Sequence, residues 1–92
     1  QFEENKGTIL LQNRPNPFKE ETLISFNLPE ATFATLTIYD VNGRSLKVIE
    51  GNYNEGYNEV SVQASELSAS GVMIYQLKTG DVTITKTMLM ID

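Results

Sequence analysis

Short runs of alternating apolar and polar residues constrain this chain more than any other feature. Gly, Pro and Asn separate the runs at intervals of about ten residues, a spacing typical of a β-sandwich. Alternation places successive side chains on opposite faces of a strand, so each run can cover a core with one face only. The pattern predicts seven strands, at residues 8–13, 22–28, 34–40, 44–50, 57–63, 72–79 and 82–91.

Turn residues predict how these strands are connected. Arg14-Pro15-Asn16-Pro17 ends the first strand, because two prolines remove two main-chain donors and fix φ. Asn42-Gly43 predicts a two-residue type I′ turn, which needs positive φ at both central positions and would join the third and fourth strands as a hairpin. Residues 64–67 are expected to form one helical turn, and Thr79-Gly80-Asp81 the last hairpin turn.

The chain predicts one domain, because no repeat, low-complexity segment or change of composition divides its 92 residues. We expect residues 1–7 to be the remnant of a linker, since they are polar, and residues 8–92 to form the domain. The first residues lack the basic-then-apolar order of a signal peptide, and no stretch approaches the roughly 20 apolar residues that span a bilayer. Export would therefore require a signal further upstream.

Composition argues against several classes of function. Histidine and cysteine are absent, which removes the commonest general base, the Ser-His triad and thiolate metal sites. The seven Lys and Arg residues are scattered in a chain of net charge −5, so no basic surface for nucleic acid is expected. We expect no catalytic, cofactor or metal site, and no small-molecule substrate.

Two local patterns can each be interpreted either as a binding site or as residues that only stabilise the fold. Asp40-Val41-Asn42-Gly43 begins like a calcium-binding EF-hand loop, but Ser45 and Gly51 stand where that loop needs Gly and Glu. Turn chemistry explains the same residues. Tyr39, Tyr53 and Tyr57 allow either an aromatic platform for a sugar or cross-strand aromatic packing.

The last strand departs from the alternation. It alternates through Thr87, after which Met88-Leu89-Met90-Ile91 is apolar on both faces. A strand that is apolar on both faces is typical of a buried position, whereas an apolar sheet edge in a soluble protein is normally blunted by charge or proline. Either the domain covers both faces itself, or a partner completes their burial.

Four motifs occur in a specific order along the chain: Leu11-Gln12-Asn13-Arg14-Pro15-Asn16-Pro17-Phe18, Ile38-Tyr39-Asp40-Val41-Asn42-Gly43-Arg44, Leu67-Ser68-Ala69-Ser70-Gly71-Val72-Met73-Ile74-Tyr75-Gln76-Leu77, and Lys86-Thr87-Met88-Leu89-Met90-Ile91. Together they resemble the type A C-terminal sorting domains of type IX secretion cargo. The resemblance covers about residues 9–91.

This resemblance implies a seven-stranded antiparallel immunoglobulin-like β-sandwich at the C-terminus of a larger exported protein of a Gram-negative bacterium. Such a domain is an address and not an enzyme. The cargo crosses the periplasm and then the outer-membrane type IX translocon with its shuttle proteins. A sortase-like peptidase usually removes the domain and attaches the cargo to the cell surface.

The resemblance also implies which residues matter. The family-motif positions are Pro15, Asn16, Pro17, Phe18, Tyr39, Asp40, Gly43, Arg44, Gly71, Tyr75 and Leu77. The residues expected to be recognised by a partner are Lys86, Thr87, Met88, Leu89, Met90 and Ile91. The alternative function is an immunoglobulin-like spacer or adhesive module, or a carbohydrate-binding module, of a secreted protein.

Overall fold

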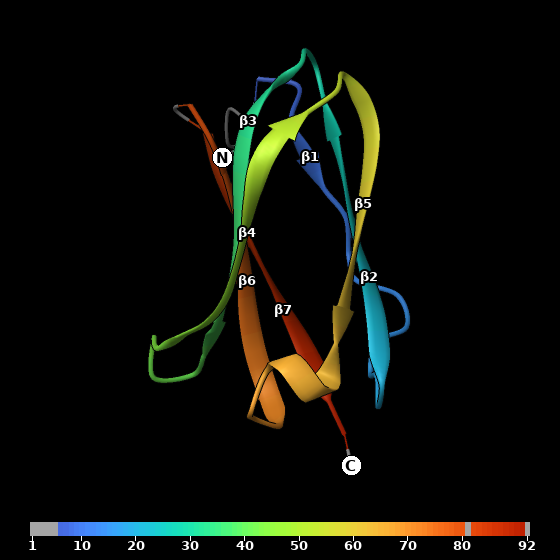
Figure 1. Cartoon of the computed structure of the whole chain (residues 1–92), viewed down its shortest axis with the longest axis vertical. Helices are drawn as coiled ribbons and strands as arrows, with labels where there is room; N and C mark the ends of the chain where they lie inside the picture. The colour runs from blue at the N-terminus through green and yellow to red at the C-terminus, as the bar shows by residue number, and fades with distance from the viewer. Residues whose placement is uncertain (1–5, 81, 92) are drawn as a thin grey trace, which may run out of the picture.

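Two antiparallel β-sheets pack face to face in the computed structural model, which describes residues 6–80 and 82–91 (Figure 1). The strand order is β1-β2-β5 in the three-stranded sheet and β4-β3-β6-β7 in the four-stranded sheet. The elements are β1 (Ile9–Leu10), β2 (Glu21–Leu28), β3 (Thr32–Asp40), β4 (Ser45–Tyr53), β5 (Gly56–Gln63), the 3-10 turn η1 (Ala64–Glu66), β6 (Gly71–Thr79) and β7 (Val82–Met90). The predicted immunoglobulin-like β-sandwich is confirmed.

Alternation predicted six of the seven strands to within three residues at either end. The first strand is much shorter than the expected 8–13, because the chain leaves one sheet for the other. Leu11 still forms one main-chain hydrogen bond with β2 and Arg14 forms two, and Phe18 then forms a parallel bridge with Met90 of β7. Both peptide bonds that precede Pro15 and Pro17 are cis.

The turn between β3 and β4 is not the predicted type I′. Gly43 has a φ of 87°, but Asn42 is not left-handed, and the register shifts between Ile38 and Tyr39. The cause is the Asp40 carboxylate, whose Oδ1 accepts the N–H groups of Asn42 and Arg44, both at 2.9 Å. This side chain stabilises a longer turn with one left-handed residue and a bulge.

The core lies between the sheets and is built from one face of each strand. At one side of it, the rings of Phe26 and Tyr53 meet edge to face, with centroids 5.1 Å apart. The largest fully buried side chains are Tyr75, Phe18, Phe26, Ile24, Leu28, Ile38, Leu67, Met73, Leu77, Met88, Val62 and Asn13. Four of these are family-motif or tail residues, so the motifs contribute to the fold itself.

The domain boundary predicted at residue 8 stays a prediction. Residues 1–5 of the expected linker, like Asp81 of the last hairpin turn, lie outside the described residues. β6 and β7 pair from Thr79–Val82 to Gly71–Met90, so the last strand finishes at the end of the sandwich where η1 lies (Figure 1).

Candidate functional site

Five of the six predicted recognition residues belong to β7, which is an edge strand of the four-stranded sheet, and the sixth, Ile91, directly follows it. Their side chains alternate between two environments. Met88 and Met90 face the core and are 1% and 8% exposed, whereas Ile91 is 43% exposed and Leu89 is half-buried. Thr87 is exposed, and Lys86 is half-buried on the same side of the strand as Met88.

The outer edge of β7 is covered by residues 12–18, a segment that we call the edge cap. Phe18 donates its N–H to the Leu89 carbonyl at 3.0 Å, and its own carbonyl accepts the Ile91 N–H at 2.9 Å. Asn16 Oδ1 accepts the Leu89 N–H at 2.9 Å, and Gln12 Nε2 donates to the Thr87 carbonyl at 2.8 Å. The edge cap therefore forms hydrogen bonds with the main-chain groups along the outer edge of the tail.

A buried polar network holds the edge cap in place. The Tyr75 hydroxyl donates to the Leu11 carbonyl at 2.8 Å and accepts the Asn13 N–H at 2.9 Å. Asn13 Nδ2 donates to Thr22 Oγ1 at 2.9 Å and to the Pro15 carbonyl at 3.2 Å. Burial raises the pKa of the Tyr75 phenol to about 12, against a smaller lowering by the Asn13 N–H.

A second group of family-motif residues forms the β3–β4 turn. Arg44 Nε lies 3.2 Å from Asp40 Oδ2, and Gly43 supplies the left-handed residue. The Arg44 N–H is the main cause of a lowered Asp40 pKa, with the Asn42 N–H and the Arg44 guanidinium acting in the same direction against desolvation. These motif residues therefore have a structural role as a turn.

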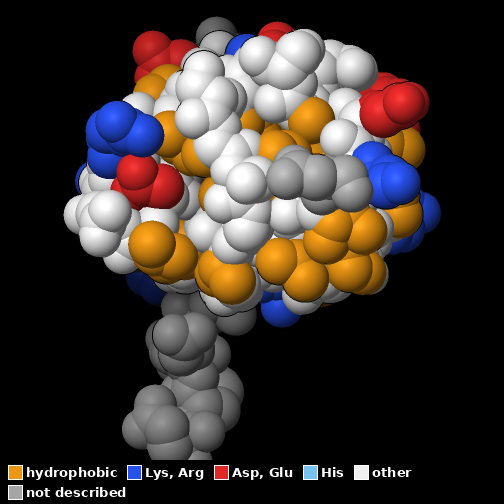
Figure 2. Space-filling model, turned by 90° about the horizontal axis from the view of Figure 1, so that it is seen from below, with side chains coloured by type: hydrophobic (Ala, Val, Ile, Leu, Met, Phe, Trp, Pro, Cys, Tyr) orange, Lys and Arg blue, Asp and Glu red, His pale blue; other side chains and the backbone are white. Residues whose placement is uncertain are grey.

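Apolar side chains gather on the outer face of the four-stranded sheet, beside the tail. Val72 lies opposite Leu89, and Ile74 lies between Tyr39 and Thr87. We call this surface the tail patch and define it as Tyr39, Val72, Ile74, Leu89 and Ile91. Figure 2, seen from the end at which β7 finishes, shows hydrophobic side chains gathered along one side of that end. The patch brings a motif residue and tail residues onto one surface.

The three tyrosines of the possible sugar platform do not share a surface. Tyr53 packs against the core, and Tyr39 lies on the outer face of the four-stranded sheet. Tyr57 lies on the other sheet, where its hydroxyl is 2.7 Å from Ser25 Oγ and 3.0 Å from Arg14 Nη2. Their arrangement gives a carbohydrate-binding function no support.

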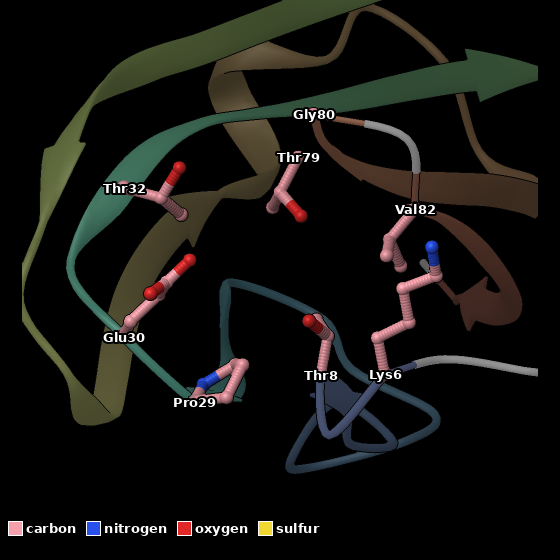
Figure 3. Close-up of a pocket in the computed structure, with 8 residues that line it drawn as sticks. All are labelled: Lys6, Thr8, Pro29, Glu30, Thr32, Thr79, Gly80 and Val82. Carbon is pink, nitrogen blue, oxygen red and sulfur yellow. The ribbon is translucent and has the colours of Figure 1, made fainter.

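A pocket of about 150 Å³, which no sequence pattern predicted, lies at the opposite end of the sandwich (Figure 3). Its lining is Lys6, Thr8, Pro29, Glu30, Thr32, Thr79, Gly80 and Val82. Sequence reasoning missed it because these residues come from separate segments that only the fold brings together. Its polar groups are threonine hydroxyls, one carboxylate and one ammonium group, which make no recognisable catalytic set.

Residues 6–80 and 82–91 contain no group of three His, Cys, Asp or Glu side chains that could hold a metal ion. In the same part of the chain, no helix has the length and hydropathy needed to cross a membrane.

The fold and the site define a small all-β module. Its distinctive feature is a terminal strand that is hydrogen-bonded to the edge cap and has an apolar outer face. A family model described as the secretion system C-terminal sorting domain matches residues 14–91. The chain belongs to this family, the C-terminal sorting domains of the type IX secretion system. A search of curated proteins found no match.

Membership has three consequences. A sorting domain implies a cargo in the same polypeptide and export of that cargo to the cell surface or beyond. The family is one of sorting signals and is not known for catalysis. The matched range includes the motif residues from Arg14 onward and the tail, and it leaves out Leu11, Gln12 and Asn13 of the edge cap and its network.

Proposed function

We propose that this domain carries an upstream cargo from the periplasm across the outer membrane through the type IX translocon and its shuttle proteins. A sortase-like peptidase then removes the domain when the cargo reaches the surface. The family match over residues 14–91 carries the proposal, because it runs from within the edge cap through the later motifs to the tail.

Within this function, we assign the six tail residues two roles. Met88 and Met90 anchor the strand in the core, so they act on recognition only through the position of their neighbours. Thr87, Leu89 and Ile91 project from the other face and are available to a partner, together with Lys86, which forms no ion pair with any described residue. The partner therefore contacts the tail patch through side chains.

The paired edge supports recognition by side chains over recognition by strand addition. A partner that adds a strand needs free main-chain N–H and C=O groups along the edge. Beside Leu89 those groups already bond to Asn16 and Phe18. Strand addition at this point would first have to displace the edge cap, whereas the outer face of Leu89 is accessible in the folded domain.

A charge placed on the tail patch tests this function. Leu89→Asp and Ile91→Asp put a carboxylate where the partner would bury an apolar side chain, so we expect surface display of a full-length cargo to fall about tenfold or more. Val48→Asp is the matched control, because Val48 is 52% exposed on the same outer face but lies on β4. Surface labelling of intact cells, with periplasmic cargo measured alongside, gives the result.

Display of both tail-patch variants at the level of the unmodified cargo would contradict the proposal. Thermal unfolding of the purified variants separates a recognition defect from a folding defect. Val48 and Ile91 are exposed and Leu89 is half-buried, so none of the three substitutions lies in the core. We therefore expect the three variants to have similar thermal unfolding midpoints.

A further inference from the structure

The edge cap pairs with β7 in a parallel register at one point. Phe18 and Met90 form a parallel bridge through the two bonds that Phe18 makes with Leu89 and Ile91. A parallel ladder repeats every two residues along both strands. The next rung would need the Asn16 N–H to donate to the Thr87 carbonyl, and the Asn16 carbonyl to accept the Leu89 N–H.

Side-chain amides fill both places of that rung. Gln12 Nε2 donates to the Thr87 carbonyl at 2.8 Å, in place of the Asn16 N–H. Asn16 Oδ1 accepts the Leu89 N–H at 2.9 Å, in place of the Asn16 main-chain carbonyl. A carboxamide carries the same donor and acceptor groups as a peptide unit, so two side chains continue a ladder that the main chain does not complete.

We propose that Gln12 and Asn16 are positioning residues that substitute for peptide groups along the tail, and that they prevent β7 from pairing with β7 of a second copy of this chain. The proposal goes beyond the sorting function and does not depend on it. It concerns the folded domain by itself.

A second copy is the partner that this edge fits. Residues 87–91 carry no charged side chain, so nothing in the segment would oppose pairing with an identical strand. Two identical antiparallel edges are also self-complementary about a two-fold axis. The edge cap does not create a comparable edge in turn, because Pro15 and Pro17 have no N–H to donate.

The two amides can be replaced without disturbing the core. Gln12 and Asn16 are both exposed, whereas the parts that hold the edge cap, Phe18 and the Tyr75–Asn13 pair, are buried. A double variant, Gln12→Leu with Asn16→Leu, should therefore fold and lose the substituted rung, together with the bond that Gln12 Nε2 donates to Asn13 Oδ1 at 2.7 Å. Asn52→Leu with Asn54→Leu is the matched control, because both residues are exposed and their side chains form no hydrogen bond with described residues.

Hydrogen–deuterium exchange of single amides, measured by NMR on the 92-residue chain, tests the positioning role. We expect the Leu89 amide of the double variant to exchange about tenfold faster than in the unmodified chain or the control. The Met88 amide should not change, because alternation directs it toward β6. Asn16→Asp keeps an oxygen acceptor and should keep the Leu89 amide protected.

Unchanged exchange at Leu89 would overturn the assignment, and so would an equal acceleration at Leu89 and Met88, which would mean that the whole strand had loosened. Sedimentation of the same proteins tests the protective role. We expect the double variant to self-associate at concentrations where the control is monomeric. A double variant that stays monomeric wherever the control does would overturn that role.

Discussion

Tyr75 links the two sheets through a single hydroxyl group. Its ring is in the core, while the hydroxyl bonds to main-chain groups of Leu11 and Asn13, which lead into the edge cap. A buried hydroxyl with two such partners is costly to remove, because both partners lose a hydrogen bond away from water. The motif tyrosine therefore acts on the tail at a distance, through the residues that hold the edge cap.

Alkaline pH tests the role of Tyr75. The fold raises the pKa of Tyr75 to about 12, from about 10 in the unfolded chain. The stability that depends on the neutral phenol is complete below pH 10 and is lost as the pH rises toward 12, by about 1.4 kcal/mol per unit. We expect Tyr75→Phe to cost about 1–3 kcal/mol at pH 7, and this deficit to shrink above pH 10.

Urea unfolding at pH 7 to 11 measures the free energy of unfolding of Tyr75→Phe and of the unmodified chain. Tyr57→Phe is the control, because Tyr57 is exposed. A deficit of Tyr75→Phe that stayed constant over this range would contradict the assignment of the alkaline loss to Tyr75.

At the scale of the element, β7 combines anchoring and display in one strand. Met88 and Met90 face the core, and Thr87 and Leu89 face outward beside Ile74 and Val72 of β6. An edge strand needs protection along its main chain as well, and the edge cap supplies it at Leu89. The four consecutive apolar residues of the tail are explained by these two roles, because one face of the strand is anchored in the core and the other carries the apolar surface.

Alanine substitutions should separate the two faces. Met88→Ala removes a fully buried side chain and should cost about 2–5 kcal/mol of unfolding free energy. Leu89→Ala, at a half-buried position, should cost about 1 kcal/mol or less. Equal losses in urea unfolding would show that the two faces do not differ in burial as described.

At the scale of the whole molecule, the sandwich brings the edge cap and the tail together. The edge cap and the tail are far apart along the chain, and the Leu89–Asn16 bond joins positions separated by 73 residues. The pocket lined by Lys6 and Val82 lies at the other end of the molecule. One end of the sandwich therefore carries the first and last family motifs.

The parts that could be predicted from sequence are those that local rules control. Alternation predicted the strands, and the motif order predicted the family. The turn at Gly43 was predicted in place but wrong in type, because the Asp40 side chain, and not the Asn42-Gly43 pair alone, determines it. The edge cap could not be predicted, since its bonds join residues far apart in sequence and depend on which strand lies at the sheet edge.

The most direct test of the central claim is the display of a reporter fused ahead of residues 1–92 and given a signal peptide, in a bacterium that has the type IX system. We expect the reporter to reach the surface with the unmodified domain and to accumulate in the periplasm with Leu89→Asp. Periplasmic retention of the reporter with the unmodified domain, while a native cargo of the same cells is displayed, would contradict the account.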